Sequence, residues 1–73
     1  MLKSSNGIGK HIRALRKMQH LTQAELGAKC GLERTSITNI EMGRQALTTN
    51  SINAIAEALG YKVHVTFRRK ERP

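Results

Sequence analysis

The sequence predicts a mainly α-helical domain of four to five helices that ends in a β-strand. Two patterns predict this fold. From residue 8 to residue 60, apolar side chains recur at helical spacing, with capping residues and glycines between the segments. After Gly60 the apolar side chains alternate with polar ones, as in a strand. The length of 73 residues allows one domain, 1–73, with a helical core (8–60), a strand (61–67) and a basic tail (68–73).

The composition narrows the classes of function. Thirteen Lys and Arg residues stand against five acidic residues, all Glu, for a formal net charge of +8. This excess favours a polyanionic partner, with nucleic acid ahead of an anionic membrane. Cys30 is the only cysteine, which excludes an intrachain disulfide or a thiolate zinc cluster. The histidines lack paired ligand spacing, so we expect no metal, no cofactor and no enzymatic activity.

No apolar run reaches the length of a signal peptide core or a membrane span. We therefore expect a cytoplasmic protein without membrane association. A lone thiol that packs into the core also suits a reducing compartment.

The first helix is expected from about Ile8 to His20, with Asn6 or Ser5 as its N-cap. Its apolar face is formed by residues at helical spacing: Ile8, Ile12 and Leu15. Its opposite face is basic: Lys10, Arg13 and Lys17. We interpret the basic face as solvated, with one or two phosphate contacts as the alternative.

The second helix begins with a capping box, because Glu25 follows Thr22 by three residues. Leu26 and Cys30 are expected to line its buried face, and Gly31 is expected to end it in a left-handed conformation. Gly27 lowers the helix propensity by about 1 kcal/mol relative to Ala, which points to close packing at that position.

The third helix is expected to start near Glu33 or Arg34 and to stop at Gly43 as its C-cap. Ile37 and Ile40 face the core. Polar side chains share the opposite face within roughly 140° of arc, at about 100° per residue: Arg34, Thr35, Thr38 and Asn39. This composition is unusual for a face that is merely solvated.

The fourth helix is expected to follow a loop at Arg44–Leu47, with Thr48 or Thr49 as its N-cap and Gly60 at its end. Its inward residues are Ile52, Ile55, Ala56 and Leu59. The strand that follows has an apolar face: Tyr61, Val63, Val65 and Phe67. Because no other strand exists in the chain to pair with it, we expect antiparallel pairing across a two-fold homodimer. The basic tail either touches DNA or simply solubilises the end.

Three segments closely resemble the helix-turn-helix of the phage repressor and Cro (XRE) family. They are Leu21–Leu26 (LTQAEL), Gly31–Leu32, and Thr35–Arg44 (TSITNIEMGR), and with the flanking helices the resemblance covers about 8–60. The ending 59–67 (LGYKVHVTF) is similar to HipB-type antitoxins, whose strand pairs across the dimer. The resemblance thus implies a repressor-like helix-turn-helix fold.

The resemblance also implies roles for individual residues. Arg34, Thr35 and Asn39 reach base edges, with Thr38 beside them. The phosphate contacts are Gln23, which also braces the recognition helix, and Arg44, Thr48 and Asn50. Arg16 and Glu41 form an ion pair between the first and third helices, although independent surface charges are the alternative. Glu33 departs from the family, which often has Ser or Thr at this cap.

These observations predict a homodimeric, sequence-specific transcriptional repressor that reads a palindromic operator through the major groove of double-stranded DNA. Arg34 supplies a fork-shaped donor for guanine, Asn39 suits adenine, and the methyl group of Thr35 or Thr38 suits thymine. The alternative is an antitoxin that neutralises a HipA-like toxin and autoregulates its operon. RNA binding is a weaker third hypothesis, because aromatic stacking platforms are missing.

Overall fold

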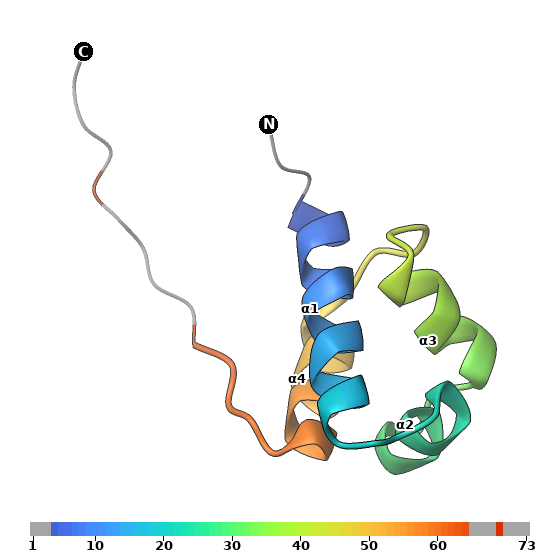
Figure 1. Cartoon of the computed structure of the whole chain (residues 1–73). Coiled ribbons are helices and arrows are strands. Elements are labelled where there is room, and N and C mark those ends of the chain that lie inside the picture. The colour runs from blue at the N-terminus through green and yellow to red at the C-terminus, as the bar shows by residue number, and fades with distance from the viewer. Residues whose placement is uncertain (1–3, 65–68, 70–73) are drawn as a thin grey trace.

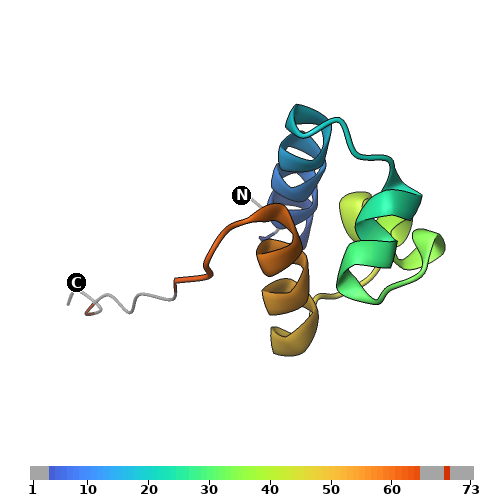
Figure 2. The same ribbon diagram turned by 90° about the horizontal axis from the view of Figure 1, so that it is seen from below.

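The computed structural model describes residues 4–64 and residue 69, with side chains from residue 7 onward. It contains four helices: α1 (Ser4–Met18), α2 (Gln23–Cys30), α3 (Arg34–Glu41) and α4 (Thr49–Leu59). The α2–α3 pair packs on one side of α1 and α4 (Figures 1 and 2). The expected mainly helical fold is therefore confirmed at four helices.

The core is formed by apolar side chains from all four helices: Ile12, Leu26, Ile37, Ile40, Ile55 and Leu59. Each fully buried side chain of this kind contributes about 1.5–3 kcal/mol to folding. Half-buried residues pack around this core: Ile8, Leu15, Leu21, Cys30, Leu32 and Leu47. The inward faces expected from helical periodicity are confirmed for α1, α2 and α3. In α4, Ile55 and Leu59 are buried as expected, whereas Ile52 and Ala56 are only half-buried.

The start of α1 differs from the expectation. The helix begins at Ser4, so Ser5 and Asn6 lie inside it and neither is its N-cap. The first turn carries no apolar side chain, and for that reason hydrophobic periodicity does not detect it. The helix ends at Met18, two residues before the expected end at His20. His20 leaves the helix with a φ of 59°, and the amide of Leu21 donates to the carbonyl of Arg16.

Local signals place the boundaries of α2 and α4 correctly. The amide of Glu25 donates to the Thr22 hydroxyl at 3.0 Å, and the amide of Thr22 donates to the Glu25 carboxylate at 2.8 Å. This is the expected capping box. Thr48 caps α4 by accepting from the amide of Ser51, and Gly31 and Gly60 end α2 and α4 in left-handed conformations.

Gly27 is explained by the turn between α2 and α3. A Cβ atom at this position would lie 2.5 Å from the carbonyl oxygen of Leu32. The same turn is closed by a hydrogen bond from the Leu32 amide to the Gly27 carbonyl at 2.8 Å. A glycine therefore lets the chain fold back directly onto α2.

The end of α3 lies earlier than expected. Glu41 is the last helical residue and Met42 is the C-cap, so Gly43 follows the cap instead of forming it. Gly43 nevertheless takes the left-handed conformation expected of it, with a φ of 75°. At the other end, Glu33 is the N-cap, and its carboxylate makes no capping hydrogen bond.

Residues 60–64 lead away from the end of α4 (Figure 1). Residues 61–64 have no regular secondary structure, and the other residues of the expected strand, 65–67, lie outside the described residues. A strand requires a partner strand, and this single chain supplies none over 61–64. Strand pairing therefore stays a prediction. Within the described part of the chain, no helix has the length and apolar character needed to cross a membrane.

Gly9 marks a close approach of α1 to α3. An alanine Cβ at this position would lie 2.3 Å from the carbonyl oxygen of Ile40 and 2.8 Å from that of Glu41. Because both oxygens belong to backbone, Gly9→Ala forces the helices apart, which costs about 1–3 kcal/mol. The higher helix propensity of alanine offsets about 1 kcal/mol of this. We therefore expect a net loss of stability in urea denaturation followed by circular dichroism.

Gly7→Ala is the matched control for this substitution. Position 7 lies in the same helix, and a Cβ there meets no atom within 4 Å. We expect Gly7→Ala to stabilise the protein by up to about 1 kcal/mol. If both alanine variants are stabilised equally, the close approach at Gly9 does not exist in solution.

Candidate nucleic-acid interface

The recognition face is the side of α3 that points away from the core. Arg34 and Thr35 are exposed, and Thr38 and Asn39 are half-buried. Residues Ile37 and Ile40 are buried on the opposite side of the same helix. The structure therefore brings the four residues expected to read bases together on the outer side of one short helix.

A buried ion pair holds this helix against α1. The Arg16 Nε atom lies 2.6 Å from Glu41 Oε2, and Nη2 lies 3.0 Å from Oε1. The remaining nitrogen, Nη1, donates to the carbonyl of Leu21 at 2.8 Å. Both side chains are buried, and the hydrogen bond to Glu41 raises the pKa of Arg16. The two residues are therefore a bidentate pair between α1 and α3, and not two independent surface charges.

Gln23 and Thr38 extend the pair into a four-residue network. The Gln23 amide donates to Glu41 Oε1 at 3.1 Å, and its oxygen accepts from the Thr38 hydroxyl at 2.7 Å. The Thr38 hydroxyl also lies 3.0 Å from the carbonyl of Arg34. Gln23 thus braces α3 from the first turn of α2. The Thr38 hydroxyl is directed at protein acceptors, which leaves its methyl group as the part available to a base.

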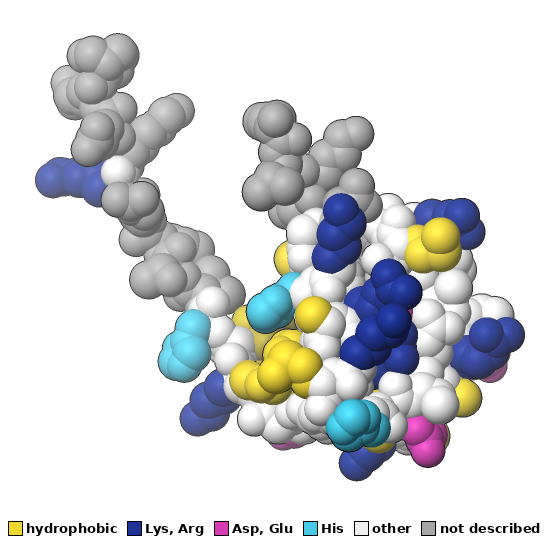
Figure 3. All heavy atoms as spheres, viewed as in Figure 1, with side chains coloured by type: hydrophobic (Ala, Val, Ile, Leu, Met, Phe, Trp, Pro, Cys, Tyr) yellow, Lys and Arg dark blue, Asp and Glu magenta, His cyan; other side chains and the backbone are white. Residues whose placement is uncertain are grey.

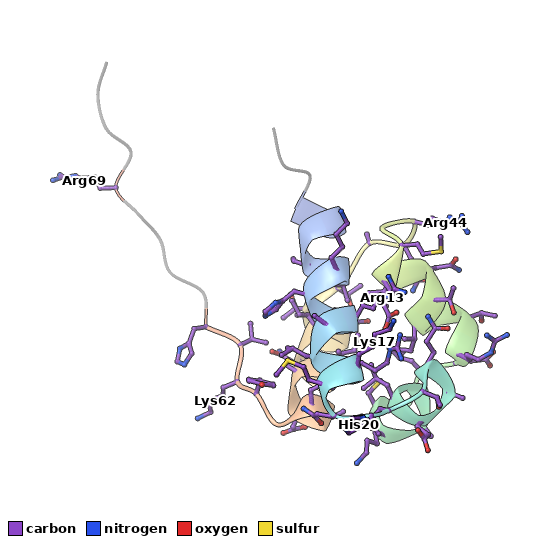
Figure 4. All side chains as sticks on the ribbon, viewed as in Figure 1. Arg13, Lys17, His20, Arg44, Lys62 and Arg69 are labelled. Carbon is purple, nitrogen blue, oxygen red and sulfur yellow. The ribbon has the colours of Figure 1, made fainter. Side chains whose placement is uncertain are left out.

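The other expected phosphate contacts lie at the far end of α3. Arg44 is exposed at the loop that follows α3 (Figure 4). This loop returns to the helix, because the amides of Arg44 and Gln45 both donate to the carbonyl of Asn39. Asn50 is exposed in the first turn of α4. The Thr48 hydroxyl is engaged with the amide and the side chain of Ser51, so its role in the folded chain is helix capping.

Positively charged side chains gather over α1 and α3. Figure 3 shows Lys and Arg side chains over α1 and alongside α3. Among the described residues the Arg16–Glu41 pair is the one salt bridge. The other described cations there form no salt bridge, and their field favours an anionic partner.

An apolar groove lies on the other side of α1. It has a volume of about 530 Å³, and it opens between α1 and α4 beside residues 61–63. We call it the α1–α4 groove, and its walls include Ile8, Leu15, Ile52, Ala56, Tyr61 and Val63. Of the expected dimer residues, Tyr61 is 49% exposed and Val63 is half-buried. Val65 and Phe67 lie outside the described residues.

Sequence reasoning missed two features of these surfaces. Met18 and Met42 place large apolar side chains at the surface, where they are 70% and 54% exposed. The α1–α4 groove was also not predicted, because nothing in a sequence with four short helices indicates a groove. Side chains at its rim come from segments far apart in the chain, so no local pattern marks it.

Cys30 is half-buried against the core, and burial raises the pKa of its thiol. Among residues 7–64 and 69, no three His, Cys, Asp or Glu side chains cluster as a metal site requires.

The chain matches a known protein family. A family model described as Helix-turn-helix matches residues 12–65. This range contains the whole of α2, α3 and α4 and the second half of α1, from Ile12 to Met18. It therefore covers every residue of the recognition face and of the network beneath it.

Individual relatives agree with this match. The chain is 38% identical to the immunity repressor protein of Bacillus phage phi105 over 56 residues, which is 77% of this chain and 39% of the relative. It is 38% identical to antitoxin PezA of Streptococcus pneumoniae over 50 residues, or 68% of this chain and 32% of the relative. It is 33% identical to the ImmF control region 10 kDa protein of the same phage over 58 residues, which is 80% of this chain and 64% of the relative. The chain thus spans less than two thirds of the length of each.

A solved structure shares the fold. The restriction-modification controller protein C.AhdI from Aeromonas hydrophila superimposes with a TM-score of 0.79 at 27% sequence identity. The match covers 81% of this chain and 89% of that chain. The arrangement of four helices is therefore one already seen in a controller protein.

Proposed function

Because the chain belongs to the XRE (phage repressor and Cro) helix-turn-helix family, we propose that it is a sequence-specific DNA-binding regulator. It acts as a homodimeric repressor that occupies a palindromic operator and performs no catalysis. One observation carries the proposal: α3 exposes Arg34 and Thr35 to solvent while Arg16, Glu41 and Gln23 hold it from beneath. In this proposal the protein binds DNA in the cytoplasm.

In this proposal α3 enters the major groove and reads base edges. The Arg34 guanidinium presents two parallel donors to O6 and N7 of a guanine, a contact worth about 1–3 kcal/mol of discrimination. Asn39 bonds an adenine edge, and the methyl groups of Thr35 and Thr38 pack on thymine. The network beneath α3 supports this role, because a reading helix must be held at one fixed position.

The phosphate contacts flank α3 on both sides. Gln23 uses one amide N–H for Glu41, and its second N–H is left for a phosphate oxygen. Arg44 and Asn50 contact the opposite strand, with Thr48 presenting the first turn of α4 beside them. Contacts of this kind set the register of the protein on the duplex without reading its sequence.

The homodimer places two copies of α3 about one turn of DNA apart, roughly 34 Å. The α1–α4 groove supports it, because an open apolar surface of this kind marks an interaction site. In the dimer, residues 61–67 of the two subunits pair as antiparallel strands through Tyr61, Val63, Val65 and Phe67. The pairing satisfies backbone groups that one chain leaves without partners.

Val65→Pro tests the pairing. Proline has no N–H to donate to a neighbouring strand, so we expect this variant to be monomeric in light scattering. Val65→Thr keeps both the N–H and the β-branched shape, and it is expected to stay dimeric. The helical circular dichroism signal should be equal in both variants, because residue 65 lies outside the helical core. A dimeric Val65→Pro protein would place the interface elsewhere, for instance along α4.

The decisive test of the function is selection from random DNA. Purified protein is mixed with a library of random duplexes at a stated salt concentration, and the bound sequences are read. We expect an inverted repeat whose half-sites are about 10 base pairs apart centre to centre, the spacing of one helical turn. A bound pool with no sequence preference would contradict the proposal.

An antitoxin role is the second candidate. It is favoured by the 38% identity to antitoxin PezA over 50 residues. In this case the chain binds and neutralises a toxin, with a HipA-like protein as the expected partner, and represses its own operon. The test is co-expression with the adjacent reading frame. Stable co-purification and loss of the partner's toxicity support the role, and a lone gene without a neighbouring toxin contradicts it.

A further inference from the structure

A row of basic side chains lies on one edge of α1. At about 100° per residue, Arg13 and Lys17 fall within about 40° of each other around the helix axis, one turn apart. Both are exposed, and Lys10 continues the row by one turn. Figures 3 and 4 show basic side chains grouped here, with Arg13 and Lys17 directed toward the space between α1 and α3.

The contacts of α1 show which edge this is. Gly9 packs on the backbone of α3, and Arg16 binds Glu41 of α3. Ile8 and Leu15 line the α1–α4 groove on the other edge. Arg13 and Lys17 lie about 60° and 100° around the helix from Arg16, on the side away from that groove. The basic row therefore borders the junction of α1, α3 and the first turn of α2.

The charge of this row is not cancelled within the described residues. Glu41 is the carboxylate at the junction, and it is buried and already bound by Arg16 and Gln23. Neither Arg13 nor Lys17 forms a salt bridge in this part of the chain, where Arg16–Glu41 is the one pair present. Two exposed cations thus lie on the edge of α1 that borders α3, where Gln23 and Arg16 both bind Glu41.

We propose that Arg13 and Lys17 bind the phosphate backbone of the operator strand that runs along the α2 side of α3. This inference rests on the proposed function, since it requires α3 to lie in the major groove. That groove is about 12 Å wide and bounded by two phosphate backbones. Arg44 and Asn50 contact one of these backbones. The other backbone is contacted by Gln23, whose side chain has no positive charge. Arg13 and Lys17 supply it, so α1 belongs to the DNA-binding surface.

The test is the salt dependence of operator binding for Arg13→Gln and Lys17→Gln, singly and together. Each phosphate contact contributes about 0.9 to the slope of log K against log salt. We expect each single variant to flatten the slope by about 0.9 and the double variant by about 1.8. The loss of affinity of the double variant should then be about 12-fold greater at 50 mM than at 200 mM salt. Fluorescence anisotropy of a labelled operator duplex measures both.

Lys29→Gln is the matched control, because it removes one positive charge from an exposed side chain in the last turn of α2, outside both the proposed DNA contacts and the proposed dimer strand. Its slope is expected to equal that of the wild type. The ratio of operator to non-operator affinity should be unchanged in all variants, since phosphate contacts carry no sequence information.

Two results would overturn the inference while leaving the proposed function intact. The first is a wild-type protein that prefers its operator while Arg13→Gln and Lys17→Gln behave like Lys29→Gln. The second is a double variant that selects a different base sequence, which would make α1 a reader of bases. A wild-type protein without sequence preference would instead remove the proposed function itself.

Discussion

Glu41→Gln is expected to lower the free energy of unfolding by about 3–5 kcal/mol. Glu41 and Arg16 are only 6% and 7% exposed, and two hydrogen bonds join them. The amide keeps the shape of the carboxylate, but it leaves the Arg16 guanidinium buried without a counter-charge. Native domains are stable by about 5–15 kcal/mol, with small domains at the low end. Urea denaturation followed by circular dichroism should therefore show a protein close to unfolding in water.

Glu57→Gln is the control for this result. It removes the same charge from an exposed position of α4, and surface substitutions of this kind change stability by about 0.5 kcal/mol or less. Replacing both members of the pair, as Arg16→Met with Glu41→Leu, removes the unpaired charge and is expected to recover part of the loss. If Glu41→Gln is as stable as Glu57→Gln, the pair contributes no more than an exposed one.

The pair is also expected to be insensitive to alkaline pH. The hydrogen bond that Arg16 donates to Glu41 raises the pKa of Arg16 above the usual arginine value. A raised folded-state pKa contributes stability that is complete below the unfolded value and lost only above it. The contribution of the guanidinium is therefore fully present throughout the neutral and mildly alkaline range.

Arg34→Ala is expected to weaken operator binding by about 1–3 kcal/mol and to relax discrimination at one base pair of each half-site. The guanidinium is exposed at the start of α3, so its removal leaves the core intact. The Arg34 carbonyl that lies near the Thr38 hydroxyl belongs to the backbone, and alanine keeps it. Binding to the operator and to each single-base variant of it measures the effect.

Arg44→Ala is the contrasting variant. Arg44 is also an exposed arginine near α3, but its proposed partner is a phosphate. We expect Arg44→Ala to weaken binding to all DNA sequences equally and to flatten the salt dependence of binding. Discrimination between bases should be unchanged. An Arg34→Ala protein that binds its operator at wild-type strength would exclude Arg34 from base reading.

Several elements of the fold were predictable because their signals are local. The capping box of Thr22 and Glu25 and the left-handed Gly31 and Gly60 involve residues within a few positions of one another. The core of each helix followed from spacing, since 3.6 residues per turn places such side chains on one face. The start of α1 was not predictable, because its polar first turn has no apolar period.

The candidate site also combines features that the sequence predicts with features that it does not. Spacing alone grouped Arg34, Thr35, Thr38 and Asn39 on one face of α3, and the structure places them there. The ion pair of Arg16 and Glu41 was expected only from the resemblance to a family. The residues are 25 positions apart, so spacing contains no information about their contact. The direction of the Thr38 hydroxyl toward Gln23 was likewise invisible before α2 and α3 were placed together.

The sequence by itself determined the helical class and the polar face of α3, since these depend on periodicity and capping within single segments. Only the tertiary structure decided that Gly9 allows α1 to touch α3, that Arg13 and Lys17 border the recognition helix, and that an apolar groove lies on the other edge of α1. The physical reason is distance along the chain. Contacts between helices depend on how rigid segments pack, and a linear pattern within one segment does not record its neighbours.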